Sequence, residues 1–162
     1  MILAASVLIF ADCAICAAQD GLQDDKAVMA GIRSMLADPF TEKSRSAEKT
    51  VVDFSQASDK VNVIVSRSLG YYPGNDWTDM LLAHYIAGVV KVQLEDPSKT
   101  GDSRTAIRSG LQAVLSLYKK IKAKDPSLRI GELEGIDARI KNGDMELVID
   151  EALARVKAER PG

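Results

Sequence analysis

The chain has 162 residues, of which 46% are hydrophobic and 27% charged, and its formal net charge is −2 at pH 7. This length suits one domain with a real core, and the composition is that of an ordinary soluble globular protein. Both signs of charge are mixed along the chain with no basic stripe, so no nucleic-acid partner is expected.

The first predicted element is a leader over residues 1–18. An apolar run over residues 2–11 is followed by small residues, a pattern typical of a secretory signal peptide. We expect cleavage after Ala18 and export of the mature chain 19–162 to the periplasm or outside the cell. No basic residue precedes the run and Asp12 follows it, so a retained anchor and a buried first helix stay as alternatives. The run is about half of the roughly 20 residues that span a bilayer, so no membrane span is expected after cleavage.

Both cysteines, Cys13 and Cys16, lie inside this leader. Their spacing matches C-x-x-C, but cleavage removes both of them. The mature chain is therefore expected to have no disulfide, no thiolate metal site and no cysteine nucleophile.

Three Asp-Pro pairs mark the ends of predicted helices, beginning at Asp38, Asp96 and Asp125. Proline disfavours a helical conformation in the residue before it and cannot donate a backbone hydrogen bond, so each pair indicates a stop. The three aspartates fit one period of 29 residues. This spacing suggests a degenerate helical repeat as a hypothesis.

About six helices in antiparallel hairpins are expected in a single all-α domain over residues 19–162. The first is predicted from residue 22 to 37, the second from a Thr41 cap along a face that reaches Ser58, and the third from 77 to 95 after an Asp76 cap. The fourth starts after Asp102 and runs to residue 124, the fifth runs from a Ser127 cap to Asn142-Gly143, and the sixth follows an Asp144 cap.

The apolar periodicity of these segments predicts which faces point inward. The residues expected to face the core in the last three helices are Ala106, Ile107, Gly110, Leu111, Val114, Leu117, Tyr118 and Ile121, then Ile130, Leu133, Ile136 and Ile140, then Leu147, Val148, Ala152 and Val156. Small residues, among them Gly88 and Gly110, predict that the two longest helices approach closely. The β-branched residues 61–65 predict one short extended connector rather than a sheet.

The stretch AVLSLYKKIKAKDP, residues 113–126, resembles the second helix and terminal proline of a tetratricopeptide repeat. Tyr118 stands eight residues before Pro126, as the aromatic residue of that family does. Val114 and Ile121 occupy positions where the family usually has alanine, and the preceding helix lacks the family's other marker residues. The resemblance implies a stack of helical hairpins and a protein partner, and it carries no catalytic residues.

The candidate site lies in GYYPGNDWTDMLLAHYIAG, residues 70–88, which holds the only tryptophan and the only histidine of the chain. On a helical wheel, Trp77, His84 and Lys91 form one stripe outside the apolar face. Together with Tyr71 and Tyr72 from the preceding loop, this stripe is a candidate wall of a pocket for a sugar, a peptide end or another small polar ligand. In the alternative interpretation, Trp77 closes the core and His84 is a solvated or hydrogen-bonded surface residue.

Catalysis and cofactor binding have weak support in this sequence. One histidine with Asp76 or Asp79 offers too few ligands for a metal, and no nucleophile motif is present. The favoured hypothesis is therefore an exported binding or scaffolding domain, without a cofactor, for a protein, a peptide or a small polar ligand. A periplasmic hydrolase or lyase that uses His84 with nearby carboxylates is one alternative, and a purely structural interaction domain is another.

Overall fold

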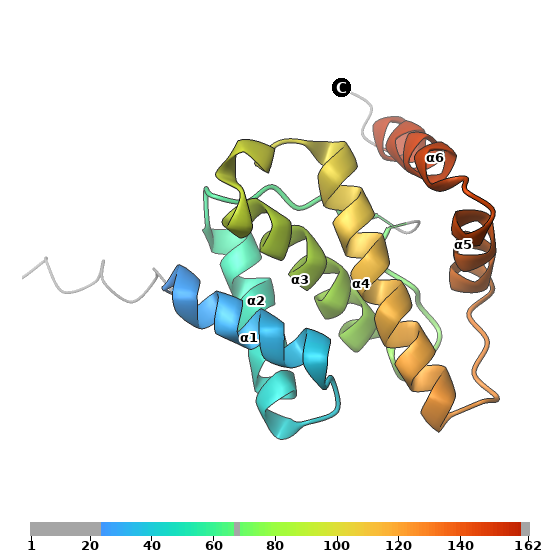
Figure 1. The fold of residues 1–162 in the computed structure, drawn as a ribbon, viewed down its shortest axis with the longest axis horizontal. Helices are drawn as coiled ribbons and strands as arrows, with labels where there is room; N and C mark the ends of the chain where they lie inside the picture. The colour runs from blue at the N-terminus through green and yellow to red at the C-terminus, as the bar shows by residue number, and fades with distance from the viewer. Residues whose placement is uncertain (1–23, 67–68, 160–162) are drawn as a thin grey trace, which may run out of the picture.

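The computed structural model describes residues 24–66 and 69–159, so the predicted leader lies outside the described part of the chain. Within that part the protein is all-helical, as predicted, with six α-helices and one 3₁₀ turn (Figure 1). Their bounds are α1 Asp25–Ala37, α2 Glu42–Ala57, α3 Thr78–Glu95, η1 Pro97–Lys99, α4 Ser103–Lys124, α5 Gly131–Lys141 and α6 Met145–Glu159. None of these helices combines the length and the apolar character that crossing a bilayer requires.

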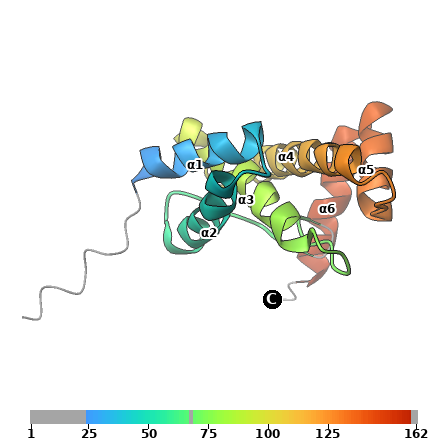
Figure 2. The same cartoon turned by 90° about the horizontal axis from the view of Figure 1, so that it is seen from below.

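The helices are arranged around α3, which packs against α1, α2 and α4. On its other side α4 contacts the hairpin of α5 and α6, which lies at one end of the molecule (Figures 1 and 2). The regular stacking that the tetratricopeptide resemblance implies stays a prediction.

Helix α3 is buried on nearly all sides because helices cover it from three directions. The predicted close approach to α4 is confirmed. A Cβ atom added at Gly88 would lie 2.5 Å from the Ser109 carbonyl oxygen and 2.8 Å from the Ala113 Cβ, and one added at Gly110 would lie 2.6 Å from the Tyr85 ring. Only glycine allows the two helices to meet at these points.

The three Asp-Pro pairs end helices as predicted, with Asp38, Asp96 and Asp125 as the C-caps of α1, α3 and α4. In each turn the aspartate Oδ1 accepts a hydrogen bond from the backbone N–H two residues later. In two of the turns a serine hydroxyl also donates to this oxygen at 2.6 Å, from Ser98 to Asp96 and from Ser127 to Asp125. These bonds hold the pKa values of Asp96 and Asp125 below their ordinary range.

The prediction that Asp76 caps α3 is wrong. The N-cap position is Trp77, and its backbone N–H donates to the Asn75 side-chain oxygen at 2.9 Å. The Thr78 hydroxyl donates to the carbonyl oxygens of Tyr72 and Asn75. Asparagine builds such turns as readily as aspartate does, and here Asn75 rather than Asp76 makes the hydrogen bonds at the start of α3.

Two predictions near the C-terminus are also wrong. Ser127 does not cap α5, because its hydroxyl donates to Asp125 in the Asp-Pro turn and the helix begins four residues later. Leu147 does not face inward, since its side chain is 52% exposed and Ile149 is fully buried instead. The buried face of α6 is rotated because this helix contacts both α4 and α5.

The segment over residues 61–65 has no regular secondary structure. Side chains of α3 hydrogen-bond its backbone. Asn62 N–H donates to Gln93 Oε1 at 2.7 Å, Gln93 Nε2 donates to the Asn62 carbonyl at 2.9 Å, and the Tyr85 hydroxyl donates to the Ile64 carbonyl at 3.0 Å. These contacts satisfy backbone groups that have no strand partner.

Candidate functional site

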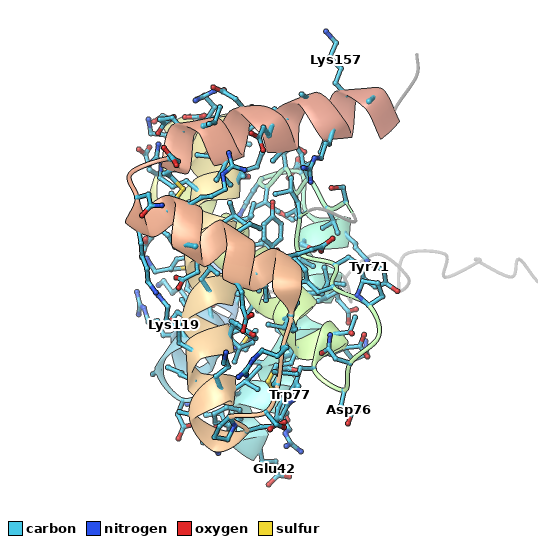
Figure 3. All side chains as sticks on the ribbon, turned by 90° about the vertical axis from the view of Figure 1, so that its right-hand side faces the viewer. Glu42, Tyr71, Asp76, Trp77, Lys119 and Lys157 are labelled. Atoms are coloured by element: carbon cyan, nitrogen blue, oxygen red, sulfur yellow. The ribbon has the colours of Figure 1, made fainter. Side chains whose placement is uncertain are left out.

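The five residues of the predicted site do not line one cavity. Tyr71 is exposed, whereas Tyr72 is buried at 1% exposure. Trp77 is half-buried and packs edge-to-face on Phe40, a residue that does not belong to the predicted stripe. The Lys91 ammonium lies 2.5 Å from the Glu95 carboxylate. Figure 3 shows Tyr71 and Trp77 at separate places around the loop that precedes α3.

The prediction that His84 lies outside the apolar face is wrong, because its side chain is only 1% exposed. Its Nδ1 atom is 2.9 Å from the Met80 carbonyl oxygen, and its Nε2 atom is 3.2 Å from the Met35 carbonyl oxygen. Burial lowers the pKa of His84, and the charge of Lys120 lowers it further, while the two carbonyl contacts oppose this shift. Both ring nitrogens are thus occupied by backbone groups.

His84 and Lys120 together cap the C-terminus of α1. The last carbonyl groups of a helix have no partner within it. The Lys120 ammonium donates to the Leu36 and Ala37 carbonyls, both at 2.8 Å, beside the contact of His84 with Met35. The positive charge of Lys120 at this end also complements the helix dipole. These two residues therefore tie α1 to α3 and α4.

A cleft of about 240 Å³ lies between α5 and α6, and we name it the α5–α6 cleft. The two helices join at the turn over residues 142–144 and diverge from it (Figure 3). The apolar lining comes from the loop before α3 and from α4, α5 and α6, and it consists of Leu69, Leu111, Ile136, Val148 and Ala152.

Four charged residues line the same cleft. Arg139 on α5 and Glu151 on α6 form a forked pair, with N–O distances of 2.7 and 2.9 Å, that lowers the pKa of Glu151. Farther from the turn lie Glu132 on α5 and Arg155 on α6. Within residues 24–66 and 69–159, neither of these two side chains forms an ion pair.

The α5 wall of the cleft contains two glycines one helical turn apart, Gly131 and Gly135. A Cβ atom added at either position would meet no atom within 4 Å. A glycine inside a helix costs about 0.5–1 kcal/mol relative to alanine. Gly135, inside the helix, therefore weakens α5, whereas Gly131 is its first residue, and both leave bare backbone at the edge of an open space.

A second hollow of about 300 Å³ adjoins the α5–α6 cleft, since Gly131 and Glu132 line both. It lies between the loop over residues 72–75 and the start of α5. Tyr72 is the one predicted site residue in its lining, and burial raises the pKa of this phenol to about 12. Arg129 also lines the hollow, and its guanidinium donates to the Pro126 and Leu128 carbonyls.

Comparisons with protein-family models, with curated proteins and with solved structures found no match. Among the described residues, no three His, Cys, Asp or Glu side chains are grouped so that they could hold a metal ion. The described part of the chain is an all-α fold with an opening between α5 and α6 whose lining includes five apolar side chains.

Proposed function

We propose that the protein is an exported helical binding domain and that the α5–α6 cleft is its ligand site. The observation that carries this proposal is the opening of about 240 Å³ between α5 and α6, at whose floor the nearly buried side chains of Leu111 and Val148 lie. Ligand pockets are typically concave and mostly apolar, with a few charged or polar groups that orient the ligand. The cleft combines such a floor with four charged side chains.

The geometry gives less support to the two alternatives. A general base must reach the proton that it abstracts, and both nitrogens of the buried His84 contact carbonyl oxygens instead. A structural interaction domain is favoured by a broad exposed apolar patch. Among the described residues, the exposed large apolar side chains are Val65 and Tyr71 on one loop and Leu147 on α6.

Indole, a small apolar probe, is expected to shift the amide NMR signals of Gly135, Val148 and Ala152. Gly135→Leu should abolish these shifts, because the new side chain enters the cleft at a position with free space. Ala138→Leu is the matched control, since it adds the same side chain at an exposed position of α5 outside the lining. Shifts that persist in Gly135→Leu, or that lie elsewhere, would contradict the proposal.

The export part of the proposal is supported by the apolar run over residues 2–11 and the small residues after it. N-terminal sequencing of the protein recovered from outside the cytoplasm is expected to begin at Gln19. A protein that retains Met1 in that fraction would contradict cleavage after Ala18.

A further inference from the structure

We propose that the α5–α6 cleft binds a dipeptide-sized zwitterion with apolar side chains, its ammonium group beside Glu132 and its carboxylate beside Arg155. This inference rests on the proposed function, because it names the ligand class of the same cleft. It follows from the charges, the volume and the open wall of the cleft.

Of the four charged side chains that line the cleft, one acidic and one basic side chain form no ion pair among the described residues and can face a ligand. Arg139 and Glu151 neutralise each other through two hydrogen bonds at 2.7 and 2.9 Å. Glu132 and Arg155, one on each helix, form no ion pair among the described residues, although the charge of Arg155 also helps to lower the pKa of Glu151. A ligand with one positive and one negative end matches both, whereas a ligand with a single charge leaves one of them unmatched.

The volume and the lining decide the size and the character of the ligand. The cleft volume of about 240 Å³ is below the roughly 300–1,000 Å³ of pockets for drug-sized molecules. The Arg139–Glu151 pair joins the two helices across the cleft and restricts its width. The occupant is therefore a small molecule rather than a folded partner, and the floor around Leu69 and Ile136 favours aliphatic side chains.

On the α5 side of the cleft, two glycines expose the helix backbone to the open space. Gly131 and Gly135 leave the peptide groups of the first turns uncovered by side chains. A glycine is the usual solution where another backbone must approach closely. A dipeptide presents a peptide group of its own between its two charged ends, so the bare wall accommodates its backbone beside α5.

Three probes test the two ends separately: leucyl-leucine, N-acetyl-leucyl-leucine and leucyl-leucinamide. In NMR or calorimetric titrations of the full-length exported protein, we expect loss of either charge from the probe to weaken binding about three- to tenfold. Glu132→Gln should weaken the two probes that carry an ammonium group and leave N-acetyl-leucyl-leucine unchanged. Arg155→Gln should weaken the two that carry a carboxylate and leave leucyl-leucinamide unchanged.

The outcomes separate this inference from the proposed function. Equal binding of all three probes, abolished by Gly135→Leu and kept in Ala138→Leu, would overturn the zwitterion assignment and leave the cleft as an apolar ligand site. If indole shifts the amide signals of the cleft and none of the three dipeptide probes does, the zwitterion assignment also fails and the apolar ligand site stands. If neither indole nor the dipeptides shift these signals, both proposals fail.

Discussion

The free energy of unfolding is expected to fall as the pH drops below 6.5, because the folded protein buries His84 as a neutral ring. Burial holds the pKa of this ring below its ordinary value of 6.5. Below that pH the unfolded chain takes up a proton that the folded protein does not bind. Stability present above pH 6.5 is then lost by up to about 1.4 kcal/mol per pH unit, until the folded ring is protonated too.

Chemical denaturation of the wild type and of His84→Gln at pH 7.5, 6.5 and 5.5 measures this effect. Glutamine stays uncharged and retains a donor for the Met35 carbonyl, so the variant should lose about 1–2 kcal/mol at pH 7.5 and lack the fall below pH 6.5. Glu48, whose pKa is raised by burial, acts with the opposite sign and is present in both proteins. Parallel pH profiles of the two proteins would contradict a neutral buried His84.

The position of His84 illustrates where sequence reasoning stops. The helical wheel placed Trp77, His84 and Lys91 on one stripe, but it could not show that α1 covers His84 in the middle of that stripe. The polar ring is tolerated there because a carbonyl of Met35, distant in sequence, lies 3.2 Å from it. A buried polar group needs such a partner, and a wheel contains no partner from another helix.

Helix ends were predictable where local chemistry alone determines them. The Asp-Pro pairs and the cap at Thr41 need only residues within one turn, and they are confirmed. The assignments at Asp76 and Ser127 failed because a neighbouring polar residue, or a neighbouring turn, competes for the same hydrogen bonds. Local competition of this kind is resolved by tertiary packing rather than by propensity.

The α5–α6 cleft could not be predicted because it depends on how four separate segments meet. Its one local signal was the spacing of Gly131 and Gly135 within a helix of 11 residues. The acidic residues between them instead suggested a solvated surface. That description still suits the exposed Glu132 side chain, but not the open space beside the glycine backbone.

Replacing Gly88 by leucine is expected to lower the free energy of unfolding by about 3 kcal/mol, at the upper end of the cost of overpacking a core. Even the first added carbon would lie 2.5 Å from the Ser109 carbonyl oxygen. This oxygen belongs to the backbone of α4, so relief requires the two central helices to separate. The loss is expected despite a gain of up to about 1 kcal/mol in helix propensity.

Gly135→Leu is the matched control, because it makes the same change inside another helix, where a Cβ atom meets nothing. It should raise the free energy of unfolding by about 0.5–1 kcal/mol, since only the propensity gain remains. Denaturant titrations of both variants at pH 7.5 measure the expected loss of unfolding free energy in Gly88→Leu and the expected gain in Gly135→Leu. If Gly88→Leu were as stable as Gly135→Leu, α3 and α4 could not approach as closely as Gly88 and Ser109 do. If both variants lost stability, the space beside Gly135 would not be open. The open α5 wall on which the ligand proposals depend would then be absent.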